Sequence, residues 1–201
     1  MQQGYTVEFI DLYAKQWVPV LDRDEFAPFD GPFKPQREQW NAVKGGLLAS
    51  EVEADLQAVF RADLLVLSFP LWWFSLPAIL KGWIDRVFVM GGVSGGDVGV
   101  FDQAALTGRR AVVLATTGGP AETFTRDGAF GDANEFLFHI NRGMLEFVGY
   151  DALEPVITFG PAHLDDVQRA EALGDVRHAF RDIDDRSLAV TSRSRPVAAH
   201  R

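Results

Sequence analysis

Hydrophobic residues in this chain fall into short continuous runs and longer periodic stretches, and the two kinds alternate. Apolar runs at residues 64–69 and 110–115 are typical of strands that are buried on both faces. A partly alternating segment at residues 6–12 and a last run at 156–159 predict two more strands. Apolar positions at helical spacing predict helices over residues 50–60, 77–88, 132–148 and 164–181.

Some element boundaries carry signals of their own. Pro77 suits the first turn of a helix, because its missing N–H has no helical partner there. Asp132 with Glu135 has capping-box spacing, and Gly149 is a natural helix stop. Residues 14–46 show no clear period and contain four prolines, so we expect a long ordered loop there.

Strands that alternate with helices form parallel sheets joined by right-handed crossovers. The pattern therefore predicts an α/β fold with one domain over residues 1–181 and no internal repeat. The sequence turns polar from Asp182 onward, so we expect residues 182–201 to form a polar C-terminal tail.

Composition and charge narrow the function classes. The chain of 201 residues has a net charge of −9, which argues against binding to nucleic acid. It contains no cysteine, which excludes disulfides, thiolate metal sites and cysteine nucleophiles. Four histidines without a carboxylate cluster at ligand spacing predict no metal site. Without a leader or an apolar run of spanning length, we expect a cytoplasmic protein with no membrane insertion.

The segment after the first buried run is a candidate binding site, because parallel α/β sheets bind ligands beyond the carboxyl ends of their strands. Four large apolar residues, Leu71, Trp72, Trp73 and Phe74, stand there between two prolines. Prolines fix φ, so this loop should be stiff. Stiff amides beside aromatic side chains suit a flat ring system with polar edges. A loop packed on the core or at a dimer interface explains the segment about equally well.

A second candidate loop follows the next buried run and consists of Thr116, Thr117, Gly118 and Gly119. Paired glycines allow a ligand to approach the backbone closely, and threonine hydroxyls add hydrogen bonds. The loop lacks the lysine and the longer glycine spacing of nucleotide phosphate loops. Taken alone, it is as typical of a tight turn as of a site.

Taken together and in order, these segments resemble the NAD(P)H dehydrogenase (quinone) family. The most specific match covers residues 69–88, where Phe-Pro-Leu-Trp-Trp-Phe precedes Leu-Pro-Ala-Ile-Leu-Lys-Gly-Trp and Asp-Arg-Val-Phe. Residues 116–119, 11–13 and 143–149 also fit, and the likeness extends to about Ala170.

The resemblance implies a flavodoxin-like three-layer sandwich, a homodimer, and hydride transfer from NAD(P)H to quinones or similar small acceptors. FAD, or FMN in some members, carries the hydride. Residues 71–74 would contact the flavin ring, and residues 116–119 would hydrogen-bond its pyrimidine edge. Phe124 joins the implied cofactor-binding residues, and it and Phe130 stand where family members often carry tyrosine and histidine. Neither phenyl group exchanges a proton, so we expect no catalytic side chain at these positions.

The chain differs from the family pattern at its start. Family members open with a strand, a phosphate-binding loop and a first helix, whereas residues 1–4 here align with the end of that helix. We therefore expect a parallel sheet of four strands. Two alternatives to the enzyme stay open: a flavin-poor regulatory or interaction paralogue, and an N-terminally incomplete gene model of the enzyme.

Overall fold

The computed structural model describes residues 4–189, which form two compact units. One unit combines residues 4–65, Leu76–Arg110 and Phe147–Tyr150, and the other combines Val66–Ser75, Ala111–Glu146 and residues 151–189. Because their segments interleave along the sequence, the units do not correspond to consecutive domains. The expectation of one domain over residues 1–181 stays a prediction.

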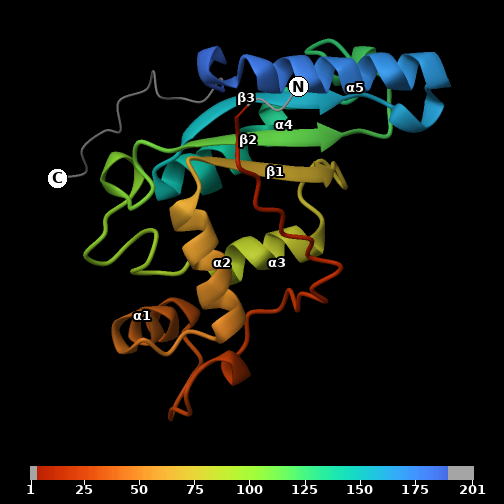
Figure 1. Ribbon diagram of the computed structural model, residues 1–201. Helices are drawn as coiled ribbons and strands as arrows, with labels where there is room; N and C mark the ends of the chain where they lie inside the picture. Colours follow the sequence, from red (N-terminus) through yellow and green to blue (C-terminus); the bar gives the residue numbers. More distant parts are fainter. Residues whose placement is uncertain (1–3, 190–201) are drawn as a thin grey trace. The chain divides into compact units, whose positions relative to one another are not determined.

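A three-stranded parallel sheet forms the centre of the second unit. Its strands are β1 (Leu64–Pro70), β2 (Arg110–Thr116) and β3 (Asp151–Thr158), in the order β1-β2-β3 (Figure 1). The α/β prediction is confirmed, but within residues 4–189 the sheet has three strands and not four.

The missing strand is the one predicted at residues 6–12, which form neither helix nor strand. Val7 and Phe9 are each 80% exposed, so the apolar side chains that suggested a strand are not packed against a sheet. The side chain of Glu8 instead pairs with Arg61 at 2.9 Å. A strand is stable only when a neighbour satisfies its backbone groups, and this segment has no such ladder.

Two of the predicted strands also differ in detail. β1 was expected to be buried on both faces, yet Val66, Ser68 and Pro70 are exposed while Leu67 and Phe69 are buried. β3 begins at Asp151, five residues earlier than predicted. The strand includes a proline at 155, which an edge strand tolerates.

Helix α5 (Asp166–Arg181) packs on β3, and so does the turn Asn141–Leu145 that follows α4 (Ala133–Ile140). Asp132 caps α4 as predicted, because its side chain accepts a hydrogen bond from the amide of Asn134. α4 continues through one turn of π-helix, Asn141–Leu145, and the helical stretch ends at Gly149, whose φ is 107°. Within residues 4–189 no helix has the length and apolar character needed to cross a membrane.

The first residues of the predicted polar tail lie against β3. Ile183 is fully buried, and Leu188 forms an antiparallel bridge with Leu153. The amide of Glu154 donates to the carbonyl of Ser187 at 2.8 Å. The rest of the predicted tail, residues 190–201, lies outside the described residues.

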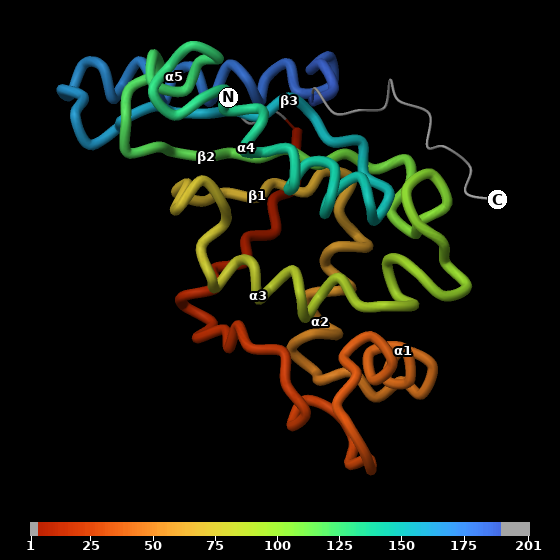
Figure 2. The backbone as a smooth tube through the Cα atoms, turned by 180° about the vertical axis from the view of Figure 1, so that it is seen from behind, coloured from red at the N-terminus to blue at the C-terminus, as the bar shows by residue number. Residues whose placement is uncertain are grey.

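The other unit contains three helices, α1 (Pro35–Gly45), α2 (Ser50–Arg61) and α3 (Ala78–Val87), and α2 packs on α3 (Figure 2). α1 lies in the stretch that we predicted as a loop. Its ends have ordinary helix signals, since Pro35 occupies the first turn and left-handed Gly46 follows the last. The prolines and glycines that we read as loop residues are therefore the boundaries of a helix.

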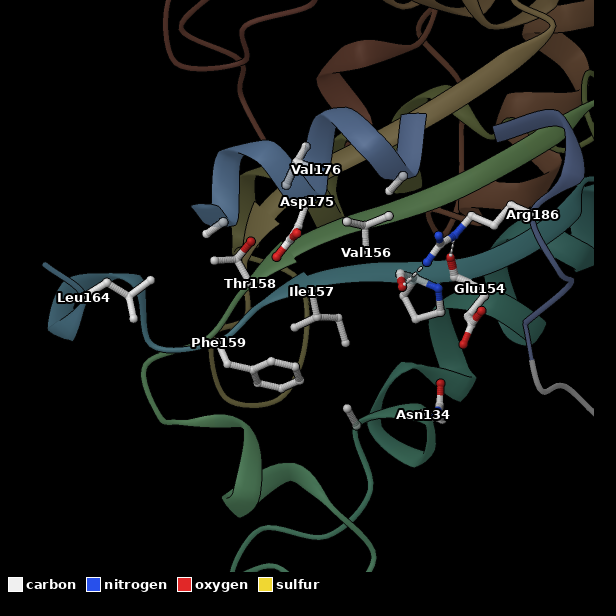
Figure 3. Close-up of a pocket in the computed structure, with 14 residues that line it drawn as sticks. Asn134, Glu154, Val156, Ile157, Thr158, Phe159, Leu164, Asp175, Val176 and Arg186 are labelled. Atoms are coloured by element: carbon white, nitrogen blue, oxygen red, sulfur yellow. Dashed lines mark hydrogen bonds between the residues drawn. The ribbon is translucent and has the colours of Figure 1, made fainter. Parts of the chain in front are cut away.

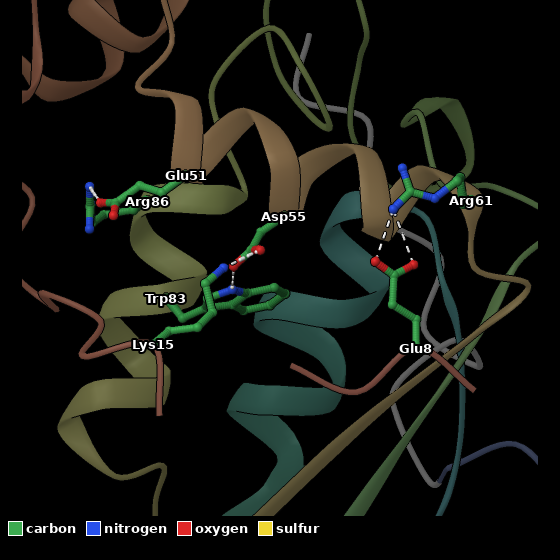
Figure 4. Close-up of polar contacts among 7 residues, drawn as sticks. All are labelled: Glu8, Lys15, Glu51, Asp55, Arg61, Trp83 and Arg86. Atoms are coloured by element: carbon green, nitrogen blue, oxygen red, sulfur yellow. Dashed lines mark hydrogen bonds and ion pairs between the residues drawn. The ribbon is translucent and has the colours of Figure 1, made fainter. Parts of the chain in front are cut away.

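Buried polar contacts hold residues 15–25 onto α2 and α3. The guanidinium of Arg86 pairs with Glu51 at 2.5 Å (Figure 4). It also pairs with Glu25 at 2.7 Å and donates to the carbonyl of Val18. Asp55 on α2 is also buried, and its carboxylate accepts bonds from the Lys15 ammonium and the Trp83 indole. Each buried charge has a partner, as the desolvation cost of an unpaired charge requires.

Gly82 on α3 provides a first test of this packing. A methyl group there would overlap the backbone and ring of Pro19. We expect Gly82→Ala to destabilise the fold by about 1–3 kcal/mol, as overpacking does, although alanine favours helix by roughly 1 kcal/mol. Urea unfolding checks this. Gly174→Ala on α5, where nothing lies within 4 Å of the added carbon, should be neutral or stabilising. A Gly82→Ala protein as stable as wild type would contradict the packing.

Glu25 provides a test by pH. Burial raises the pKa of its carboxyl, while Arg86 acts in the opposite direction. A raised pKa in the folded chain means that stability falls as pH rises from about 4.3, the ordinary value, through the folded pKa. Replacing Glu25 with Gln removes this titration. Urea unfolding between about pH 4 and 7 should then show wild type losing stability relative to E25Q as pH rises.

A matched control for E25Q is Glu53→Gln, because Glu53 is an exposed carboxylate on α2. Its stability difference from wild type should vary less over the same pH range. A constant difference between wild type and E25Q would show that the Glu25 carboxyl does not titrate with folding.

Candidate functional site

The carboxyl ends of the three strands are tied together by backbone hydrogen bonds that continue beyond the sheet. The amide of Leu71 donates to the carbonyl of Thr116 at 2.8 Å. The amide of Thr117 donates to Thr158, and the carbonyl of Thr117 accepts from Gly160, both at 3.1 Å. The two loops singled out from the sequence are therefore neighbours at one end of the sheet, where parallel α/β folds bind ligands.

The first loop contains a tight turn with unusual backbone conformations. Trp72 and Ser75 exchange two backbone hydrogen bonds, of 3.1 and 3.0 Å, around Trp73 and Phe74. The φ angles of Trp73 and Phe74 are 51° and 58°, in the left-handed region that favours glycine. Such strain costs about 1–3 kcal/mol per residue and gathers at functional sites. This strain could not be predicted from the sequence, because neither residue type favours positive φ.

The side chains of this loop are displayed and not buried. Trp73 is 95% exposed and Trp72 is 54% exposed. Exposed indoles do not contribute to a core. The interpretation of this segment as a loop packed on the core is therefore wrong for its two tryptophans. They are available to a ligand or a partner surface.

Phe74 joins a cluster of aromatic rings. Its ring stacks on Phe136 of α4 at 4.6 Å, with Phe130 at 5.7 Å and Phe124 at 6.5 Å. Phe124, which is buried, also contacts Phe159 at the end of β3. Sequence reasoning identified Phe74 and Phe124 but missed Phe136 and Phe159 as site residues, because only the fold brings these four rings together.

In the second loop, most polar groups of Thr117 are already bonded inside the protein. Its hydroxyl donates to the carbonyl of Gly119 at 2.8 Å, so this buried side chain fixes the shape of the loop. The amides of Gly118 and Gly119, by contrast, have no hydrogen-bond partner within residues 4–189. A Cβ on Gly118 would meet nothing within 4 Å. The loop thus offers two free donors beside open space, and the exposed Thr116 adds a hydroxyl.

This donor set fits the flavin that the family resemblance implies. An isoalloxazine ring has two apolar faces and one polar edge, which match exposed aromatic rings and free backbone donors respectively. The free amides of Gly118 and Gly119 are the observation on which this fit depends, since donors that the protein leaves unpaired at its surface are available to a ligand.

A polar pair that the sequence did not indicate lies beside the ring cluster. The hydroxyl of Ser75 is 2.9 Å from Nε2 of His139 on α4. The other ring nitrogen, Nδ1, is 2.7 Å from the carbonyl oxygen of Phe136. Ser75 had no visible signal in the sequence, and His139 was noted only as a histidine among apolar residues.

A separate groove of about 520 Å³ runs along β3 between α5 and the start of α4 (Figure 3). Val156 turns toward Val176 on α5, whereas Ile157 turns toward the side where Asn134 lies. The guanidinium of Arg186 donates to the carbonyls of Glu154 and Pro155, so it is not free to bind an anion. None of the residues predicted to bind a cofactor lines this groove.

Metal binding receives no support from the structure. Among residues 4–189, no group of three or more histidine, aspartate or glutamate side chains is arranged to hold an ion.

Comparisons with known proteins identify the family of this chain. The family model described as a flavodoxin-like fold matches residues 1–180. Human ribosyldihydronicotinamide dehydrogenase [quinone] is 41% identical over 164 residues, which cover 80% of this chain and 70% of that protein. The NAD(P)H dehydrogenase [quinone] 1 of Cavia porcellus is 34% identical over 187 residues, or 92% of this chain and 68% of the relative.

Solved structures of a quinone reductase and of an FMN-binding protein are also similar to this chain. A candidate quinone reductase from Klebsiella pneumoniae superposes with a TM-score of 0.86 at 32% identity, covering 93% of this chain and 76% of that one. The general stress protein 14 of Treponema denticola, solved in complex with FMN, has a TM-score of 0.56 at 25% identity, covering 72% and 78%. The chain therefore belongs to the flavodoxin-like family of flavin-dependent NAD(P)H quinone oxidoreductases.

Proposed function

We propose that this chain transfers hydride from NAD(P)H to quinone-like small molecules with a flavin held at the carboxyl ends of β1 and β2. The observation that carries the proposal is the pair of free amides at Gly118 and Gly119 beside the exposed aromatic turn at residues 72–74. The bound flavin would supply two-electron chemistry, accepting hydride from the nicotinamide and passing it to the acceptor.

The residues of the chain have distinct tasks in this proposal. Amides of Gly118 and Gly119 donate to the pyrimidine edge, where they stabilise the negative charge of the reduced ring. Thr117 keeps those amides in place, and Thr116 offers a further hydroxyl. Residues 71–74 contact the ring faces through side chains and backbone. Phe124 packs edge-on against Phe74, with the ring centroids 6.5 Å apart, and so helps to hold that ring in place.

FAD is our first choice of cofactor, with FMN as the alternative. The resemblance implies FAD, whereas FMN is the flavin bound in a related solved structure. Releasing the flavin from the purified protein by heat, followed by chromatography and mass measurement, distinguishes the two.

The regulatory paralogue is the weaker hypothesis. Two relatives that match this chain over most of its length, at 41% and 34% identity, are named as quinone dehydrogenases. A catalytic role follows from that likeness, whereas no feature of the described site favours a purely regulatory one. A cytoplasmic location belongs to the same proposal, because NAD(P)H is the electron donor. Cell fractionation tests it.

Substitution of Gly118 tests the flavin site directly. Gly118→Val would place a branched side chain beside the free amides, at a position where no protein atom lies within 4 Å of the added β-carbon. We expect flavin affinity to fall at least about tenfold, equivalent to ~1.4 kcal/mol, with the melting temperature unchanged. Titration of the flavin-free protein, followed by flavin fluorescence, measures this.

Gly174→Val on α5 is the matched control, because nothing lies within 4 Å of that position either. It should bind flavin as wild type does. Equal affinity of Gly118→Val and wild type would place the flavin elsewhere.

We also propose that the chain forms a homodimer through its displayed aromatic side chains. Trp72, Trp73 and Phe138 are all exposed, and tryptophans are common binding hot spots. Light scattering should give twice the chain mass. Trp73→Ser should raise the dimer dissociation constant roughly 30-fold, as about 2 kcal/mol of lost contact would.

Leu173→Ser serves as the control for the dimer test, because Leu173 is an exposed apolar residue on α5. It should leave the association unchanged. A wild-type chain that stays monomeric at high micromolar concentration would contradict the dimer.

A further inference from the structure

Ser75 and His139 form a hydroxyl–imidazole pair whose protonation pattern is fixed by the backbone. The carbonyl oxygen of Phe136 can only accept a hydrogen bond, so the Nδ1 atom of His139, 2.7 Å away, carries a proton. In the neutral ring Nε2 then has none, and it accepts the hydroxyl proton of Ser75 at 2.9 Å. The pair therefore has one defined direction of hydrogen bonding in each protonation state of the ring.

The location of the pair connects it to the proposed site. Ser75 closes the strained turn and directly follows Phe74, whose ring stacks on Phe136. Phe136 and His139 are three residues apart on α4 and so lie on one face of that helix. Because His139 is exposed, its imidazole can take up protons from solvent.

The reaction requires a proton donor, and the neighbouring phenyl rings cannot supply a proton. Addition of hydride to a quinone leaves one oxygen with a negative charge, and a proton must reach that oxygen to give the hydroquinone. Phe74, Phe124, Phe130 and Phe136 have no proton to give. The hydroxyls of Thr117 and Thr123 already donate to backbone carbonyls, and neither is bonded to an imidazole.

We propose that Ser75 and His139 form a proton relay that protonates the reduced acceptor. This inference rests on the proposed function. In the imidazolium form, Nε2–H of His139 donates to Oγ of Ser75. The Ser75 hydroxyl proton passes to the acceptor oxyanion while Oγ takes the Nε2 proton, which leaves neutral imidazole and neutral hydroquinone. The relay moves one proton and no electrons, since both electrons arrive with the hydride, and water then reprotonates His139.

The geometry of the pair is tested first without any turnover. Nitrogen NMR of the imidazole in the full chain, with no acceptor present, should show His139 as the Nδ1–H tautomer. Ser75→Ala should shift the Nε2 resonance, and Ser75→Thr should restore it. The proposal is overturned if His139 is found in the Nε2–H tautomer, or if its Nε2 resonance does not shift in Ser75→Ala.

Turnover is then compared with two acceptors that differ in their demand for protons. A quinone needs a proton on its oxygen, whereas ferricyanide accepts an electron and no proton. We expect His139→Ala and Ser75→Ala to lower kcat with the quinone about 100-fold, the lower end for general acid catalysis. The rate with ferricyanide should stay within about twofold of wild type, since no acceptor proton is needed.

Three further variants separate proton transfer from a structural role. Added imidazole should restore quinone turnover to His139→Ala. His139→Gln keeps a hydrogen-bonding group but exchanges no proton, so it should be as slow as His139→Ala. The matched control is His163→Ala, because His163 is an exposed histidine just after β3 and has no hydroxyl partner in the described structure. It should behave as wild type.

The outcomes also distinguish this inference from the proposed function. A wild-type chain that reduces neither acceptor would contradict both the proposed function and the proton relay. Wild-type rates in His139→Ala with both acceptors, full activity of His139→Gln, or loss in His163→Ala alone would overturn the relay and leave the proposed function intact. Equal loss with quinone and ferricyanide would show that the pair only holds the turn in place.

Discussion

Backbone hydrogen bonds beyond the ends of the strands hold the candidate site together. Thr116 and Thr117 occupy the central position, since their backbones bond to the loop after β1 on one side and to the end of β3 on the other. Parallel strands that end together place their following loops at one edge. Without this arrangement, the aromatic turn and the glycine pair would be unrelated loops. The chemistry of the site therefore depends on main-chain register more than on any one side chain.

Much of this arrangement could be predicted from the sequence, because the signals lie in contiguous stretches of residues. Continuous apolar runs specified β1 and β2, and the residues that follow them specified the two loops. The turn at Trp73 and Phe74 was not readable, because its positive φ angles oppose the preferences of both residues and are imposed by the bonds between Trp72 and Ser75. The partners of Ser75 and Phe74 come from α4, more than sixty residues later, and no local pattern reveals them.

The failure to predict α1 has an identifiable cause. Proline occurs both in loops and in the first turn of helices. Pro35 was taken as part of a loop although it starts α1. At residues 6–12 the opposite error occurred, since local alternation predicted a strand and the segment found no ladder. Strand pairing depends on two segments, so the sequence of one segment alone does not predict whether it pairs.

The chain after α5 has a protective effect on β3. An edge strand exposes backbone donors and acceptors that can recruit a strand from another molecule. Here Ser187 and Ala189 bond to the outer side of the strand, and Arg186 covers the next two carbonyls with its guanidinium. Residue 155, being a proline, has no amide hydrogen to offer a visiting strand. This short segment thus blocks the β3 edge against a strand from another molecule, which closes one route to aggregation.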